Sequence, residues 1–95
     1  MNKYEVTVIL SAKLEEEARA DVLEKIKGYI VRYNGTVGET EEWGKKRLAY
    51  EIQRQTEGFY YLINFEGDST TPNGLESELR IYEPVLRYRV VKKAA

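Results

Sequence analysis

The chain contains no cysteine and no histidine, so any chemistry must come from carboxylates, lysine, arginine, tyrosine or hydroxyl groups. This composition excludes thiol nucleophiles, disulfides, zinc sites built on cysteine or histidine, and acid–base catalysis by imidazole. Ser11, Ser69 and Ser77 have no histidine to activate them. No glycine-rich phosphate loop or metal-ligand spacing occurs. We therefore expect no enzyme, no cofactor, no metal site and no small-molecule substrate.

The residues left to carry a function are the cations, which gather in two segments. Lys45, Lys46 and Arg47 form the first block. The second lies toward the carboxyl end and contains Arg80, Arg87, Arg89, Lys92 and Lys93. The net charge of −1 is therefore unevenly distributed, and binding depends on local potential more than on net charge. Such clusters favour a phosphate-bearing partner, and the alternative interpretation is ordinary solvated charge.

Strands must position most of these cations, because apolar and polar residues alternate through the basic segments. This alternation, with many β-branched and aromatic residues, is typical of half-buried strands. It predicts four strands, at residues 3–11, 36–52, 59–65 and 85–92. Residues 53–58 are polar and end in glycine, so they are predicted to form a loop between two antiparallel strands.

Two segments between the strands have helical periodicity instead. Apolar residues at three- and four-residue intervals predict a helix over residues 14–33, closed by the pair Asn34-Gly35. A shorter helix is expected to begin with Thr71 as its N-cap and Pro72 as its first residue, and to end before Pro84.

The predicted order β-α-β-β-α-β, without linker or repeat, indicates one domain spanning residues 1–95. Right-handed crossovers put both helices on one face of a four-stranded antiparallel sheet, which is the α+β ferredoxin-like fold. No apolar run approaches the length of a membrane span, and the amino terminus lacks the apolar core of a signal peptide. We expect a cytoplasmic protein that does not bind membranes.

The wholly apolar side of each strand is expected to pack under the helices. This predicted core row contains Val6, Val8, Leu10, Leu48, Tyr50, Ile52, Phe59, Tyr61, Ile63, Phe65, Leu86, Tyr88 and Val90. The opposite side, here called the open face, then mixes the cations Arg47, Arg87 and Arg89 with apolar groups that include Ile9, Tyr60, Leu62 and Val91.

Apolar side chains on the open face suggest that something covers it. Burying a large one is worth about 1.5–3 kcal/mol, although small exposed patches are also common on monomers. A protein partner is therefore predicted at Tyr60, Leu62 and Val91. The mixture of arginines with flat side chains also suits RNA, because cations meet phosphates and aromatic rings stack on bases.

Several of these residues together resemble a known family. The most specific run is Gly44-Lys45-Lys46-Arg47-Leu48-Ala49-Tyr50 with Ile52, and other matches are Tyr4-Glu5, Gly58, Tyr60, Leu79-Arg80-Ile81, Val85 and Arg87. On these residues the whole chain resembles the bacterial small-subunit ribosomal protein S6 family.

The resemblance implies a ferredoxin-like, non-catalytic constituent of the small ribosomal subunit. It implies binding to the central domain of small-subunit (16S) rRNA, as a heterodimer with small-subunit ribosomal protein eighteen (S18). Carried onto this chain, it implies RNA contacts at Lys3, Arg47, Arg87, Arg89, Lys92 and Lys93.

Two alternatives remain open on the residues alone. An RNA-recognition-type module shares the element order, but stacking of bases would need Phe59 and Tyr61 on the open face, whereas their row continues through the apolar Ile63 and Phe65. The other alternative is a ferredoxin-like regulatory domain that dimerises through its sheet and binds no RNA.

Overall fold

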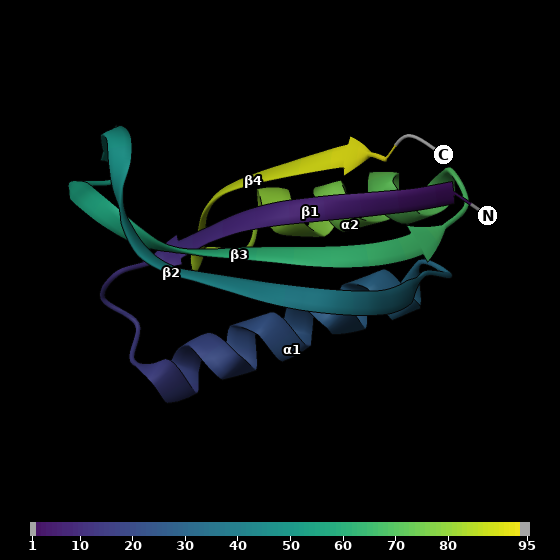
Figure 1. The fold of residues 1–95 in the computed structure, drawn as a ribbon, viewed down its shortest axis with the longest axis horizontal. Helices are drawn as coiled ribbons and strands as arrows, with labels where there is room; N and C mark the ends of the chain where they lie inside the picture. Colours follow the sequence, from purple (N-terminus) through teal and green to yellow (C-terminus); the bar gives the residue numbers. More distant parts are fainter. Residues whose placement is uncertain (1, 94–95) are drawn as a thin grey trace.

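A computed structural model describes residues 2–93 and contains the six expected elements in the expected order. They are β1 (Asn2–Ser11), α1 (Glu16–Arg32), β2 (Thr36–Ile52), β3 (Gln55–Gly67), α2 (Thr70–Arg80) and β4 (Val85–Lys92). The strands form an antiparallel sheet in the order β2-β3-β1-β4, with both helices on one face (Figure 1). The predicted α+β ferredoxin-like fold is confirmed. Within the described range, no helix has the length and apolar character needed to cross a membrane.

The core lies between the two central strands and the helices, because β1 and β3 present continuous apolar rows to that side. Val6 pairs with Ile63 in the sheet, and neither side chain is exposed. Ile26 of α1 and Leu75 of α2 are likewise fully buried and belong to the same cluster. The predicted helix-facing rows of β1 and β3 are therefore confirmed.

The carboxyl end of α1 is closed as its Asn34-Gly35 pair predicts. Asn34 adopts a left-handed backbone with φ of 67°. The amide of Gly35 donates to the carbonyl of Ile30 at 2.8 Å, and the amide of Asn34 donates to that of Val31 at 3.1 Å. This pair of reversed hydrogen bonds is a Schellman motif, which satisfies carbonyls that the helix end leaves free.

The start of α2 differs from the prediction, because Asp68 rather than Thr71 organises it. The helix begins at Thr70, whose amide and hydroxyl both donate to the Asp68 carboxylate, the amide at 2.9 Å. Thr71 lies inside the helix and is fully buried. Its hydroxyl donates to the carbonyl of Tyr33 at 2.7 Å, so it joins the start of α2 to the end of α1.

The predicted loop at residues 53–58 is wrong, because β2 and β3 meet in a two-residue turn. Gln53 and Arg54 have φ values of 49° and 64°, which is the arrangement of a type I′ hairpin turn. β3 therefore starts at Gln55 and includes Gly58. A Cβ atom at Gly58 would lie 2.5 Å from Ile9 Cγ2, so this strand position requires glycine for a close approach rather than for a turn.

Candidate nucleic-acid interface

The register of β2 against β3 shifts at three places, and the first two shifts decide which face the basic block Lys45-Lys46-Arg47 reaches. Between Val37 and Thr40, β2 advances three residues while β3 advances two, and between Glu42 and Gly44 it advances two while β3 advances one. Gly44 occupies the second bulge with φ of 82°, a left-handed conformation that glycine adopts without strain. Each extra residue exchanges the faces of the residues that follow it.

The basic block Lys45-Lys46-Arg47 is divided by this register. Lys46 lies opposite Gly58 in the open-face row, and its Nζ is 5.4 Å from the centroid of the Trp43 ring. Arg47 lies opposite Glu57, in the row that continues to Phe59 and the helices. The expectation that Arg47 is on the open face is therefore wrong, and Lys46 takes that place.

The apolar row Leu48, Tyr50 and Ile52 was expected under the helices, and this is also wrong. The β2–β3 hairpin extends beyond the helix layer and curls over the open face toward β4 (Figure 1). Leu48 is only 8% exposed but lies outside the helix-covered core, where its Cδ2 and Ile9 Cγ2 converge over Gly58. Tyr50 is 56% exposed, and Ile52 is half-buried.

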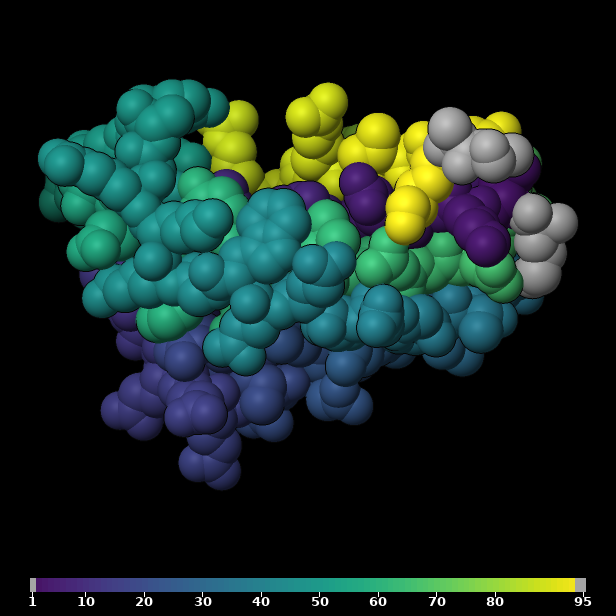
Figure 2. Space-filling model, viewed as in Figure 1, coloured from purple at the N-terminus to yellow at the C-terminus, as the bar shows by residue number. Residues whose placement is uncertain are grey.

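The curled hairpin borders a hollow of about 510 Å³ on the open face, between the hairpin and β4 (Figure 2). The side of the hollow nearer β2 is formed by Trp43, which is 43% exposed. Its other lining residues are Thr7, Ile9, Arg87, Tyr88 and Arg89. Trp43 was not selected from the sequence, although it is the only tryptophan in the chain and directly precedes the bulge glycine.

The predicted partner residues are only partly available on this face. Leu62 is 7% exposed, so its side chain already lies almost wholly within the protein. Tyr60 and Val91 are half-buried. The apolar surface that a partner could cover is therefore centred on Trp43 and Ile9 rather than on Leu62.

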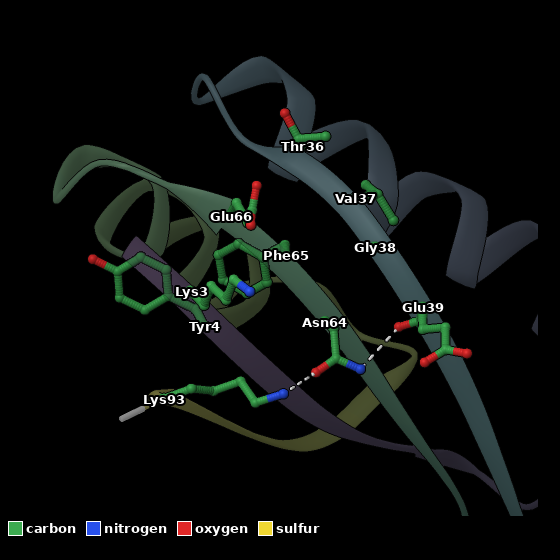
Figure 3. A pocket seen from close by; sticks show the side chains of 10 residues that line it. All are labelled: Lys3, Tyr4, Thr36, Val37, Gly38, Glu39, Asn64, Phe65, Glu66 and Lys93. Carbon is green, nitrogen blue, oxygen red and sulfur yellow. Dashed lines mark hydrogen bonds between the residues drawn. The ribbon is translucent and has the colours of Figure 1, made fainter. Parts of the chain in front are cut away.

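A second groove, of about 340 Å³, lies at the end of the sheet where β1 begins and β4 ends (Figure 3). Asn64 is at its centre and donates from Nδ2 to the carbonyl of Glu39 at 3.2 Å. Lys93 Nζ donates to Asn64 Oδ1 at 3.0 Å and lies 4.0 Å from a carboxylate oxygen of Glu5. Because the Lys93 amide also donates to the carbonyl of Lys3, Lys93 is tied to the sheet through both backbone and side chain.

The predicted RNA residues thus divide between the two sides of the sheet. Register places Lys3, Arg87 and Arg89 in open-face rows, and the hydrogen bond to Asn64 draws Lys93 there too. Lys92 is opposite Tyr4 and, like Arg47, belongs to a helix-side row, although both side chains are exposed. Within residues 2–93, no cluster of three or more acidic, histidine or cysteine side chains is placed to hold a metal ion.

Arg19 of α1 is a structural residue that sequence reasoning missed. Its Nε donates to the Tyr61 hydroxyl at 3.0 Å, and its Nη1 donates to the carbonyl of Leu14 at 2.7 Å. Its guanidinium carbon lies 3.7 Å above the centre of the Phe59 ring. These contacts keep Phe59 and Tyr61 on the helix side, so the two rings are not available for base stacking on the open face, and the RNA-recognition-type alternative is wrong.

The two helices are joined on their outer side by Glu78. The Tyr33 hydroxyl donates to Glu78 Oε2 at 2.7 Å, and Arg32 forms an ion pair with the same oxygen at 3.3 Å. The hydrogen bond to Glu78 raises the pKa of Tyr33 above its ordinary value. This cluster belongs to the helix layer and takes no part in the open face.

Comparison with known proteins agrees with this geometry. The family profile described as "Ribosomal protein S6" matches residues 3–92. The chain belongs to the ribosomal protein S6 family. Relatives named "Small ribosomal subunit protein bS6" are 42% identical over 92 residues in Alkaliphilus metalliredigens (strain QYMF), covering 97% of both chains, and 43% identical over 91 residues in Clostridium novyi (strain NT), covering 96% of both.

The fold of the S6 family is equally recognisable in three dimensions. The crystal structure of 30S ribosomal protein S6 from Thermotoga maritima superposes with a TM-score of 0.90 at 28% identity, covering 97% of this chain and 87% of that one. Membership makes this S6-family chain a small-subunit ribosomal protein, located on the ribosome in the cytoplasm, and not an enzyme.

Proposed function

We propose that this S6-family protein is a single domain that binds the central domain of 16S rRNA as a heterodimer with S18. The observation that carries the RNA part is the placement of Arg87 and Arg89 side by side in one exposed row of β4, bordering the aromatic hollow. No carboxylate lines this hollow among the residues that the structure describes. The single sheet and core shared by all six elements support the assignment of one domain.

Arginine in this position is suited to a phosphate backbone. Each guanidinium presents several N–H donors in a planar arrangement that matches phosphate oxygens, and it stays charged at any physiological pH. Alternate residues of a strand are spaced about 6.6–6.8 Å apart along its axis. Arg87 and Arg89 can therefore engage separate phosphates of one RNA strand, with Lys3 adding a cation at the other end of the face.

The partner part of the proposal is supported by the apolar surface around Trp43. A large aromatic side chain at a concave surface, with polar groups around it, is a common anchor of a protein interface. Here the ring borders Ile9 and Thr7 in the hollow, with cations on the side of β4. We assign this apolar area to S18 and the cationic rows to rRNA.

The test is binding to an rRNA central-domain fragment with purified S18, measured over a potassium chloride titration. We expect the double substitution Arg87→Gln and Arg89→Gln to weaken binding and to flatten the log–log salt dependence by roughly 0.7–0.9 for each phosphate that is no longer neutralised. Arg80→Gln is the matched control, because Arg80 is exposed at the end of α2 in the helix layer. If the double variant binds with unchanged affinity and slope, β4 does not contact the RNA.

The remaining alternative, a regulatory domain that dimerises through its sheet, makes a different prediction. It requires self-association that varies little with salt and no RNA binding. Sedimentation of the purified protein alone, over the same salt range, distinguishes the two. A monomer that joins S18 in a one-to-one complex supports the ribosomal function, and a stable homodimer that excludes S18 contradicts it.

A further inference from the structure

Arg87 is held in place by a residue from the opposite edge of the sheet. β2 and β4 are the two edge strands, separated by β3 and β1. Three spacings of about 4.8 Å set these edges roughly 14 Å apart. Even so, the Tyr50 ring near the tip of the hairpin has the Arg87 guanidinium carbon 4.8 Å from its centre.

Local features of the sequence direct the hairpin toward Arg87. The bulge at Gly44 changes the face of the residues after it, and Leu48 then anchors the hairpin by burial over Gly58 beside Ile9. Tyr50 lies in the irregular stretch between Arg47 and Ile52, where β2 advances five residues while β3 advances two, and its ring comes to lie beside Arg87. The tight turn at Gln53 and Arg54 keeps this end of the hairpin short.

We propose that Tyr50 is a positioning residue, which holds the Arg87 guanidinium in the orientation that meets RNA. This inference rests on the proposed assignment of Arg87 to RNA. An arginine side chain has many rotatable bonds, and their freedom is lost when it binds a phosphate. Stacking on Tyr50 restricts that freedom in the unbound protein, and restricting a binding group in advance raises affinity.

The geometry of stacking is compatible with RNA binding by the same guanidinium. The guanidinium carbon lies over the Tyr50 ring, and none of the ion pairs formed by residues 2–93 includes Arg87, so its N–H donors stay free for phosphate oxygens. Arg89, two residues further along β4, has no aromatic ring stacked on it among the contacts of residues 2–93. The hairpin therefore acts on Arg87 specifically.

The experiment compares Tyr50→Leu and Tyr50→Phe in the full chain, each alone and in an Arg87→Gln background. Affinity for the rRNA central-domain fragment with S18 is measured at several salt concentrations. We expect Tyr50→Leu to weaken binding about two- to fivefold, the value of an exposed cation–π contact, and Tyr50→Phe to bind like the unsubstituted protein. In the Arg87→Gln background, Tyr50→Leu should cause no further loss, because the group it positions has gone.

Two further measurements separate positioning from general destabilisation. The urea midpoint of Tyr50→Leu should stay close to that of the unsubstituted protein, since the ring is exposed. The Arg87 Nε–H resonance should move when Tyr50 is replaced by leucine, while the Arg89 resonance should not.

The outcomes distinguish this inference from the function on which it rests. If Arg87→Gln weakens binding but Tyr50→Leu does not, or if Tyr50→Leu causes the same loss in both backgrounds, Tyr50 does not position Arg87. If Arg87→Gln itself changes neither affinity nor salt slope, the assignment of Arg87 to RNA fails, and the role of Tyr50 fails with it.

Discussion

The surroundings of Trp43 account for the largest difference between the open face predicted from the sequence and the one in the structure. Its ring borders a hollow that none of the described carboxylates lines, and Lys46 Nζ lies 5.4 Å from the centre of the ring. A ring left 43% exposed in such a position contributes little to the core. The proposed partner surface therefore centres on this ring, since Leu62, one of the three residues expected to contact the partner, is already covered.

We expect Trp43→Ala to weaken the heterodimer with S18 at least about fivefold, because truncating a large aromatic anchor costs more than about 1 kcal/mol. The control is Val31→Ala, which removes an exposed apolar side chain from α1 on the other side of the sheet. Titration calorimetry of S18 into each variant measures the effect. Equal affinities for the two variants would show that the hollow is not the partner site.

At the level of elements, the sequence correctly predicted the faces of strand residues where apolar and polar residues alternate without interruption. The prediction failed where the backbone of a strand is irregular. β1 and β3 keep a strict two-residue period, so Val6, Ile63 and their neighbours were placed correctly. The register of β2 shifts at three places, and the strand ends in a hairpin beyond the helices. Apolar residues there pack on the open face instead, so the faces of Leu48 and Arg47 were both mistaken.

Specific contacts between elements also could not be predicted from the periodicity of apolar residues. Asp68 starts α2 through a local turn that competes with the expected cap at Thr71. Tyr50 and Arg87 are distant in sequence and lie on opposite edge strands, so no local periodicity could pair them. A glycine such as Gly44 is typical of a bulge, but which faces the residues after it take follows only from the register.

The bulge itself can be tested with two glycines that have the same free space but different backbones. A Cβ atom at Gly44 or at Gly28 would meet nothing within 4 Å, so only the backbone conformation matters. Gly44→Ala should destabilise the protein by about 1–2 kcal/mol, because its φ of 82° is strained for alanine. Gly28→Ala, within α1, should stabilise it by roughly 0.5–1 kcal/mol.

The free energies of unfolding of these two variants in urea provide the measurement. We expect the change in the free energy of unfolding to have opposite signs in the two variants. If Gly44→Ala were neutral, the hairpin could adopt its curled path without a left-handed residue, and the explanation given for the reversed face of β2 would be incorrect.

The contact between α1 and α2 should depend on pH through Tyr33. Its pKa is raised by the hydrogen bond to Glu78, so the native state holds this proton more tightly than the unfolded chain does. The stabilisation is therefore fully present below the ordinary tyrosine pKa, near 10, and is lost as pH rises through the raised value. Tyr33→Phe should be less stable than the unsubstituted protein at pH 8, and the difference should narrow by pH 11.

Urea unfolding of both proteins at several pH values between 8 and 11 measures that difference. Comparing the two proteins removes every pH-dependent contribution that they share, so the difference reports on Tyr33. A difference that stays constant over this range would mean that the hydrogen bond between Tyr33 and Glu78 does not contribute to stability in solution.

The whole molecule has its core on one side of the sheet and the proposed binding surfaces on the other. The helix side contains the core and the Arg19 and Glu78 contacts. The open face contains the hollow at one end (Figure 2) and the Lys3–Lys93 groove at the other (Figure 3). Cations at the groove end are not equivalent. Lys93 is bound within the sheet, whereas Lys3 is exposed and has no ion pair among those formed by residues 2–93.

Substituting these two lysines should therefore separate an RNA contact from an internal one. Lys3→Gln should flatten the salt dependence of rRNA binding by roughly 0.7–0.9 with little change in stability. Lys93→Gln should flatten it less and lower the free energy of unfolding by up to about 1 kcal/mol, because an exposed cation that is already hydrogen-bonded within the protein is worth no more than that. If both variants flatten the slope equally, RNA displaces the hydrogen bond between Lys93 and Asn64. The groove would then belong to the RNA-binding surface, and its role would not be to fix the end of β4 to the sheet.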